Sequence, residues 1–401
     1  MPVMSGHSGN EIYCLGLKRF LPGELVLGNS VYSMGFLGGI GASLRGIVGG
    51  EVEQVTSVIH EGRLQALDRM NDEAAEIHGY GITGITSELK SFRGNIEFLA
   101  VGSCVHQASE AGEAVRADLR FTTSANAQEL FCQLDAGFLP VKFVFGNVAY
   151  SIGLGGGIVG GLKTMARGEI KQFSDVLNKT RHLALGRMVK EAKAAKANAV
   201  VGIQTTVKPF QGVHEMVMTG TAARCSKLPA EASAEPVSSD LTAEELWNLT
   251  NMGYAPLKLV MGTAVYSLGW TGGISSWLKS FSKGEIAALT SLIYDAREHA
   301  IGLIRDEAEE IGADDVMGIK THIHEMGSLI EFMAIGTAVR KLPGATTTSQ
   351  ALPTQAIMRD RETWFSEGED SLTVNADGKK KEGKGGKLEL LFKVLEAVGR
   401  G

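Results

Sequence analysis

The sequence predicts an α+β fold built from three tandem copies of one small domain. The main observation is a repeated Gly-x-x-x-Tyr-Ser-x-Gly segment at Gly28–Gly35, Gly146–Gly153 and Gly262–Gly269, with offsets of 118 and then 116 residues. The register holds without a gap from Glu11 to Cys104 in the first copy. A unit that keeps its register over this length is a domain and not a short solenoid motif. In each copy, a long helical pattern also precedes two strand patterns, and this combination of helix and strands predicts the α+β class.

Each copy is predicted to open with a short amphipathic helix. The third copy shows it best, because Thr242 and Glu245 have the spacing of a capping box. The first copy contains this segment in eroded form around Glu11 and Ile12. The helix marks the start of each domain.

An apolar strand segment follows this helix. Turns at Pro22, Pro140 and Pro256 are expected to lead into runs rich in β-forming residues, such as Val141–Phe145. The run resumes after Gly146, so the segment is either two strands or one strand with a glycine bulge.

A long helix and two strands complete each copy. Gly-Glu pairs at 50–51, 168–169 and 284–285 are expected to open the longest helical pattern of the unit. In the second copy the strands Ala199–Thr205 and Val213–Thr221 follow. A helix of this length needs a sheet to lie on, so each domain is predicted to be a small antiparallel sheet with a long helix across one face.

Changes in composition delimit the domains. We expect domains at residues 11–106, 122–226 and 240–341, a flexible linker at 342–386 and a C-terminal amphipathic helix at 387–399. Segments 107–113 and 227–236 have the composition of tethers, long enough to let successive domains occupy different places in an assembly.

The C-terminal helix is predicted to have one apolar stripe, formed by Leu388, Leu391, Phe392 and Leu395. Two interpretations remain open: the helix docks onto its own assembly, or it recruits a protein partner. Mixed Lys and Glu residues on its polar side make membrane binding the weaker option.

Composition restricts the classes of function. The net charge of −6 gives no global attraction to DNA or RNA, so no nucleic-acid partner is expected. No signal peptide and no apolar run long enough to span a membrane is found, which favours a cytoplasmic location. Four widely spaced cysteines, at 14, 104, 132 and 225, favour buried, reduced thiols over disulfides.

Several recurring motifs resemble the YbjQ-like family, often labelled "heavy-metal-binding domain". They include the Gly-Glu pairs, Glu191-Ala192 on the long helix, the Ala199–Gly202 strand and the closing Gly336–Arg340 segment. The resemblance covers nearly all of residues 20–105, 138–224 and 254–340. It implies a dodecin-like βαββ unit that assembles into pentameric rings, and it implies little about chemistry.

A few polar positions are identical in all three copies and are the candidate ligand or interface residues: Tyr32, Tyr150, Tyr266, Arg63, Arg181, Arg297, Glu97, Glu215 and Glu331. One interpretation pairs Arg181 with Glu215 as a charged site beside the Tyr-Ser strand. The other makes such a pair an intersubunit or helix-to-sheet ion pair that orients packing. Because no nucleophile or ligand cluster accompanies these residues, the second interpretation is preferred, and no catalytic residue or cofactor is expected.

One local pattern suggests a metal site. His322 and His324 alternate on a predicted strand, so both imidazoles face the same side. The equivalent positions are Thr206 and Lys208 in the second copy, so the copies share no ligand set.

These observations favour a non-enzymatic protein that assembles with itself into ring-like structures. Five-fold symmetry would be satisfied by five chains forming three stacked rings, with one domain of each chain per ring. Alternatively, the three copies lie side by side in one ring, which five-fold geometry would not accommodate with whole chains. The rival function, from a different class, is a small-ligand or metal-binding module that uses clefts between the copies.

Overall fold

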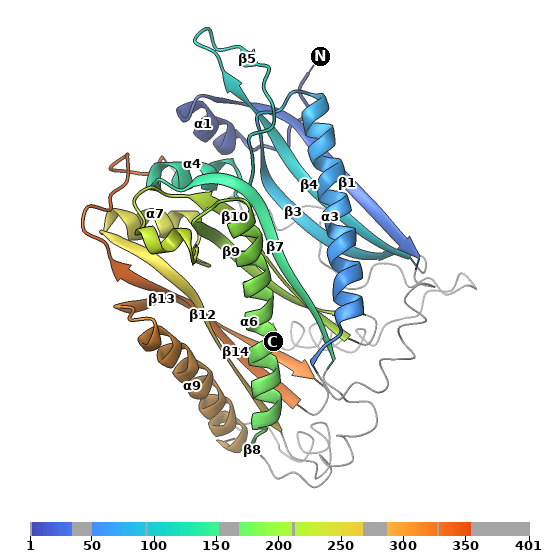
Figure 1. Cartoon of the computed structure of the whole chain (residues 1–401), viewed down its shortest axis with the longest axis vertical. Helices are drawn as coiled ribbons and strands as arrows, with labels where there is room; N and C mark the ends of the chain where they lie inside the picture. The colour runs from blue at the N-terminus through green and yellow to red at the C-terminus, as the bar shows by residue number, and fades with distance from the viewer. Residues whose placement is uncertain are drawn as a thin grey trace, which may run out of the picture. The chain divides into compact units, whose positions relative to one another are not determined.

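A long edge strand, a long helix and a β-hairpin recur three times in the computed structural model of the chain (Figure 1). The structure describes residues 2–33, 50–92, 95–151, 168–210, 213–267, 287–326 and 329–353, which lie within the unit Met1–Thr354. The predicted tail helix at 387–399, with its apolar stripe, and most of the predicted linker at 342–386 lie outside the described residues.

The three repeats share one order of elements. Repeat 1 contains α1 (Gly9–Leu17), β1 (Phe20–Ser33), β2 (Gly50–Glu51), α3 (Glu53–Glu76), β3 (Gly81–Phe92) and β4 (Asn95–Ala108). Repeat 2 contains α4 (Ala127–Ala136), β7 (Leu139–Ser151), β8 (Gly168–Glu169), α6 (Lys171–Ala194), β9 (Ala199–Phe210) and β10 (Val213–Arg224). Repeat 3 contains α7 (Ala243–Asn251), β12 (Tyr254–Ser267), α9 (Ala287–Glu310), β13 (Asp315–Met326) and β14 (Leu329–Lys341).

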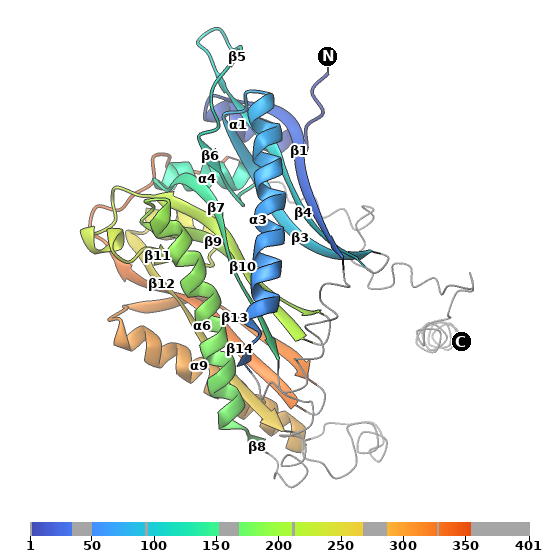
Figure 2. The same ribbon diagram turned by 45° about the vertical axis from the view of Figure 1, so that its right-hand side comes forward.

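Each repeat builds its own antiparallel sheet, with the last strand of the repeat between the other two long strands. The strand orders are β1-β4-β3-β6, β11-β9-β10-β7-β2 and β13-β14-β12-β8. The long helix of each repeat packs on its own edge strand, α3 on β1, α6 on β7 and α9 on β12. Figure 2 shows the three helices in succession across the molecule, each over the sheet of its own repeat. The mixed α+β class predicted from the sequence is therefore confirmed.

All three opening helices begin with a capping box. Ser8, Asn126 and Thr242 each accept a hydrogen bond from the backbone N–H three residues later, and a glutamate at that position bonds back to the cap. These contacts satisfy backbone donors that have no partner within the helix. The expected box at Thr242 is present, and the helix of repeat 1 is complete, not eroded.

The prolines and the recurring glycine belong to one continuous edge strand in each repeat. Pro22, Pro140 and Pro256 lie inside β1, β7 and β12 and not in turns before them, and the strand register shifts beside each of them. Proline lacks a backbone N–H, so it is tolerated where a ladder is interrupted. At Gly146 the pairing with Met218 continues without a bulge.

Gly146 is required by its own helix. A Cβ at this position would lie 2.0 Å from the backbone oxygen of Ala184 on α6. Gly28 and Gly262 show the same approach, at 2.1 Å from Ala66 O and 2.2 Å from Ala300 O. The glycine of the repeated segment therefore lets helix and strand backbones touch within each repeat.

The segments between repeats are ordered, in contrast to the expected tethers. After repeat 1, β5 (Ala114–Val115) pairs with β4, and β6 (Phe121–Thr122) pairs in parallel with β3. After repeat 2, a 3₁₀ turn at Ala230–Ser233 leads to β11 (Val237–Ser238), which pairs in parallel with β9. Each connection thus adds a strand to the sheet it has just left, which fixes where the next repeat begins.

The interior is apolar. As expected, all four cysteines are buried free thiols, and burial raises the pKa of Cys104 and of Cys132 to about 12. In the part of the chain that the structure describes, no helix is long and apolar enough to cross a membrane.

Candidate functional site

The candidate interface residues gather where one repeat meets the next. Two residues of each earlier repeat add a strand to the sheet of the later one: Gly50 and Glu51 pair with Ser151 and Tyr150, and Gly168 and Glu169 pair with Ser267 and Tyr266. The sequence predicted that these Gly-Glu pairs open the long helices. They form strands instead because their partners lie in the neighbouring repeat, and the helices begin two residues later, at Glu53 and Lys171.

The first turns of α3 and α6 continue the contact between repeats. Thr56 Oγ1 accepts a hydrogen bond from Ala149 N at 2.9 Å, and Ser174 Oγ accepts one from Val265 N at 2.9 Å. Backbone donors on an otherwise open sheet edge are thereby satisfied. These residues were not singled out from the sequence, although the signal existed: the third copy has Thr290 at the equivalent position, so every copy carries a hydroxyl there.

A buried ion pair links repeats 1 and 2. Arg63 on α3 binds Glu215 on β10 through Nε at 3.2 Å and through Nη2 at 2.9 and 3.0 Å. Its remaining nitrogen, Nη1, donates to the backbone oxygen of Ser87 at 2.8 Å and to its hydroxyl at 3.0 Å. The guanidinium and the carboxylate therefore neutralise one another out of contact with water.

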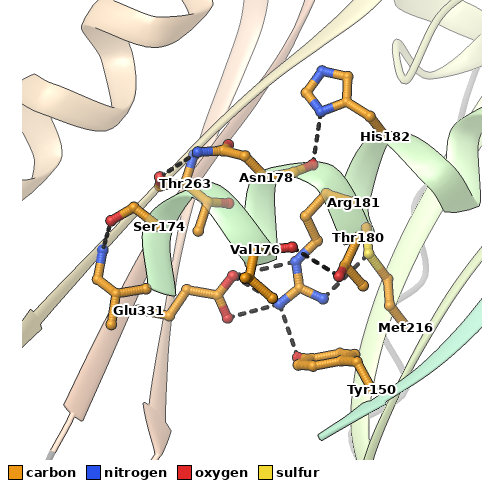
Figure 3. A network of polar contacts seen from close by, with 11 residues as sticks. Tyr150, Ser174, Val176, Asn178, Thr180, Arg181, His182, Met216, Thr263 and Glu331 are labelled. Carbon is orange, nitrogen blue, oxygen red and sulfur yellow. Dashed lines mark hydrogen bonds and ion pairs between the residues drawn. The ribbon is translucent and has the colours of Figure 1, made fainter. Parts of the chain in front are cut away.

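The same pair is repeated between repeats 2 and 3, as Figure 3 shows. Arg181 on α6 binds Glu331 on β14, with Nη2 at 2.7 Å from both carboxylate oxygens, and both side chains are fully buried. Arg181 also donates to the Tyr150 hydroxyl at 2.8 Å and contacts the Met216 sulfur at 3.3 Å. Burial lowers the pKa of Arg181 and Glu331 raises it, with a net rise, so the guanidinium stays charged.

The arginine and glutamate of one repeat therefore do not bind each other. The predicted pair of Arg181 with Glu215 is wrong, because Arg181 extends forward to Glu331 of the next repeat and Glu215 receives Arg63 from the previous one. The helix face of each repeat lies against the sheet of the next one, which brings these charges together across the boundary. Their position in a packed seam matches the interpretation of an ion pair that orients packing.

Two histidines add a second polar contact at each boundary. His182 on α6 bonds Glu307 of repeat 3 at 3.3 Å, and Glu307 also binds Lys258 at 2.7 Å. Burial raises the pKa of Glu307, but the hydrogen bonds from His182 and Lys258 outweigh it and hold that pKa at about 2. The bond to Glu307 raises the pKa of His182. At the first boundary, His60 lies 4.0 Å from Glu191.

Of the remaining candidates, Tyr266 pairs with Glu169 at the boundary between repeats 2 and 3, and Arg297, Glu97 and Tyr32 lie in the two end repeats. Arg297 on α9 is exposed and forms no ion pair within the described residues. Glu97 on β4 is half-buried and accepts a hydrogen bond from Asn29 Nδ2 at 3.2 Å. Tyr32 and Tyr266 are half-buried and pack edge-on against Phe98 and Phe332. Of the three tyrosines, only Tyr150 is shown bonded to an arginine of the set.

The two candidate metal ligands lie side by side on β13. The rings of His322 and His324 are parallel with centroids 6.3 Å apart, as alternation on a strand predicts. Burial lowers the pKa of both imidazoles, which keeps them neutral at pH 7. Over the described ranges, no group of three or more His, Cys, Asp or Glu side chains is placed to hold a metal ion.

A cavity of about 300 Å³ lies between repeats 2 and 3, beside His322. Its polar lining includes Glu129, Gln133, Thr205, Asp240, Lys320 and His322. Gln133 Oε1 and Thr205 Oγ1 are buried and have no hydrogen-bond partner in the described part of the chain. The cavity can therefore offer acceptors to a small polar molecule.

All three repeats are similar to known proteins. The profile of the YbjQ family, described as "Putative heavy-metal-binding", matches residues 22–108, 140–226 and 250–341. An encapsulin nanocompartment protein of Mycobacterium tuberculosis is 28% identical over 240 residues, which are 58% of this chain and 90% of the relative. UPF0145 proteins of Archaeoglobus fulgidus and Clostridium novyi are 42% identical over 82 residues and 38% over 85 residues. Those matches span 20% and 21% of this chain and 76% and 82% of the two relatives.

Proposed function

We propose that this chain, which belongs to the YbjQ family, is a non-enzymatic protein that assembles with copies of itself through its repeats. The observation that carries the proposal is that four of the polar residues shared by all three copies, Arg63, Glu215, Arg181 and Glu331, are used for packing between repeats. At both internal boundaries an arginine of one repeat is buried against a glutamate of the next. Further hydrogen bonds from each guanidinium, to Ser87 at the first boundary and to Tyr150 at the second, hold it in place, which favours a role in cohesion and register.

The relatives support an assembly role. The Mycobacterium tuberculosis relative is named as an encapsulin nanocompartment protein, and the match covers nearly its whole length. The UPF0145 relatives span about one repeat of this chain each. Because each repeat of this chain has one face that meets the previous repeat and one that meets the next, we propose that assembly uses the contact that joins the repeats.

Side-by-side packing is the arrangement we propose, in place of stacked rings. Stacking requires the three repeats of a chain to lie in three different rings. Here β2 joins the sheet of repeat 2 and β8 joins the sheet of repeat 3, so consecutive repeats are lateral neighbours. The dodecin-like, pentameric ring that the family resemblance implies cannot hold the repeats of this chain side by side, because a ring of five repeats cannot be made from whole chains of three.

We further propose that assembly takes place in the cytoplasm and involves neither nucleic acid nor membrane. We also propose that the segment 387–399 docks either onto the assembly or onto a protein partner. The residues that would make this contact are Leu388, Leu391, Phe392 and Leu395. Deleting residues 387–401 and measuring the assembly mass separates the two: a changed number of chains in the assembly supports self-docking, and an unchanged number leaves partner recruitment standing.

Native mass measurement of the full chain tests the proposed function. We expect a multiple of the monomer mass of 42.6 kDa. A monomer at every accessible concentration would overturn self-assembly.

A second candidate function is the binding of a small polar ligand or a metal ion in the cavity between repeats 2 and 3. The unpartnered Gln133 Oε1 and Thr205 Oγ1 favour it, together with the neutral His322 in the lining. Metal analysis of untagged protein tests the metal branch, with the double variant His322→Ala/His324→Ala as the control. Equal metal content in the two proteins would remove that branch.

A further inference from the structure

Among the described residues, half of the repeat-to-repeat contact is uncovered at each end of the array, and we propose that these two halves join one copy of the chain to the next, head to tail. The helix face of repeat 3 (Tyr294, Arg297 and Ile319) docks on the edge face of repeat 1 (Leu25, Leu27, Val31 and Glu97) of a second copy. This inference rests on the proposed self-assembly and adds to it the surfaces and their polarity.

The edge face of repeat 1 is apolar and exposed. Leu25, Leu27 and Val31 on β1 have 46%, 49% and 61% of their surface exposed. The equivalent residues of repeats 2 and 3 are at most 3% exposed: Phe143, Phe145, Ala149, Leu259, Met261 and Val265. The difference comes from the neighbour, since the preceding repeat covers β7 and β12 and β1 lies at the outer edge of its sheet. An exposed edge strand of this kind is a site for pairing with another chain.

The helix face of repeat 3 shows the converse exposure. Ile319 on β13 is 45% exposed, whereas its equivalents Ile85 and Ile203 are each 3% exposed. Arg297 is exposed, whereas Arg63 and Arg181 are buried against the next repeat. The residues that a following repeat covers at the two internal boundaries are therefore exposed on repeat 3.

The charges of the two faces are complementary. At each internal boundary the arginine comes from the earlier repeat and the glutamate from the later one. Arg297 and Glu97 are the arginine and glutamate left over by this rule. A symmetric contact between two identical helix faces would instead bring Arg297 near Arg297, so the occupant of each face is the opposite face of a second copy.

This polarity constrains the assembly. A head-to-tail contact closes into a ring if its rotation allows and otherwise extends as a filament. A closed ring contains whole chains, so the number of repeats in it is a multiple of three.

Charge reversal tests the contact. The single variants Arg297→Glu and Glu97→Arg place like charges at the junction, and we expect each to weaken association at least tenfold. The residues lie on the surface of the monomer, so the urea midpoint of each should stay near wild type. The double variant Arg297→Glu/Glu97→Arg restores opposite charges at every junction, whatever the number of chains, and should recover the wild-type mass.

The outcomes are distinguishable from failure of the proposed function. A monomeric wild-type chain overturns self-assembly itself. A wild-type assembly whose mass both single reversals leave unchanged overturns this interface and leaves self-assembly standing.

Cysteine cross-linking tests the polarity. Asn178 bonds both backbone groups of Thr263 at 2.8 Å across the second boundary, and the equivalent positions at the proposed junction are Tyr294 and Asn29. Mixing Tyr294→Cys with Asn29→Cys under mild oxidation should give a covalent dimer, and neither variant alone should do so. The intramolecular pair Asn178→Cys/Thr263→Cys is the positive control, and the native thiols are buried. A dimer from Tyr294→Cys alone would overturn the head-to-tail polarity.

Discussion

Arg181 and Glu331 form a bidentate ion pair across the boundary between repeats 2 and 3, with both side chains inaccessible to water. The Tyr150 hydroxyl, at 2.8 Å, completes the ring of groups around the guanidinium (Figure 3). A charge in this position cannot be rehydrated without separating the repeats. The pair therefore links the stability of one repeat to the presence of its neighbour.

Removing one charge of this pair should be costly. Glu331→Gln leaves the buried guanidinium of Arg181 without a counter-charge, and we expect a loss of about 3 kcal/mol in the free energy of unfolding. Urea titration followed by circular dichroism measures it. The matched control is Glu88→Gln, which removes an exposed pair with Lys90 at 2.8 Å and should cost less than about 1 kcal/mol. Equal effects of the two substitutions would show that the buried pair is not a principal link between repeats.

The contact of His182 with Glu307 predicts a pH window. The pKa of His182 is raised above 6.5, so its contribution to stability is complete below pH 6.5 and is lost as the pH rises through the folded-state pKa. The pKa of Glu307 is lowered from 4.5 to about 2, so its contribution is present above pH 4.5 and is lost as the pH falls toward 2. Lys258 also faces Glu307, at 2.7 Å.

The boundary between repeats 2 and 3 should therefore be most stable between about pH 4.5 and 6.5. Urea midpoints measured from pH 2 to pH 8 test this. His182→Gln should remove the decline on the alkaline side, and the acidic decline should persist because Lys258 still binds Glu307. An unchanged alkaline decline in that variant would assign it to other groups.

The repeat, its register and its buried glycine, cysteine and apolar positions could be predicted from the sequence, because each depends on contacts within one copy. The capping box of Thr242 and Glu245 is local and was confirmed. The partner of Arg181 could not be predicted, because Glu215 and Glu331 occupy the same position of successive copies. In a tandem repeat, a contact within a copy and a contact with the next copy have the same sequence signature.

The Gly-Glu strands were missed for a related reason. A two-residue strand has no periodicity to detect, and Glu51 and Glu169 pair with tyrosines of another repeat. Before the fold is known, their position directly ahead of a helical pattern makes them look like helix residues. The linkers were misread because their strands, such as Val237–Ser238, are only two residues long and follow segments with the composition of tethers.

One pair of side chains should make the proposed junction between copies weaker than the internal boundaries. Glu298 and Glu73 are there the equivalents of His182 and Glu307, so two acidic side chains replace a histidine-glutamate pair. Glu298→Gln should tighten association about twofold to fivefold, the range for a surface pair worth about 0.5–1 kcal/mol. Sedimentation measurements on a dilution series give the association constant between copies. Glu310→Gln is the control, because this residue is exposed at the end of the same helix, as are its equivalents Ala194 and Glu76. Tightening by both substitutions would indicate a general charge effect.

Gly146 offers a direct test of why the repeated segment contains glycine. A methyl group there would lie 2.0 Å from the backbone oxygen of Ala184, which cannot move without displacing α6. We expect Gly146→Ala to destabilise the chain by about 1–3 kcal/mol, the usual cost of overpacking. Gly186→Ala is the matched control: it lies in α6, where an added Cβ meets nothing within 4 Å. Replacing glycine by alanine inside a helix stabilises by about 0.5–1 kcal/mol, so the two substitutions should have opposite signs in urea unfolding. A stabilising Gly146→Ala would mean that helix and strand are not in backbone contact. The presence of glycine at this position of all three repeats would then need another explanation.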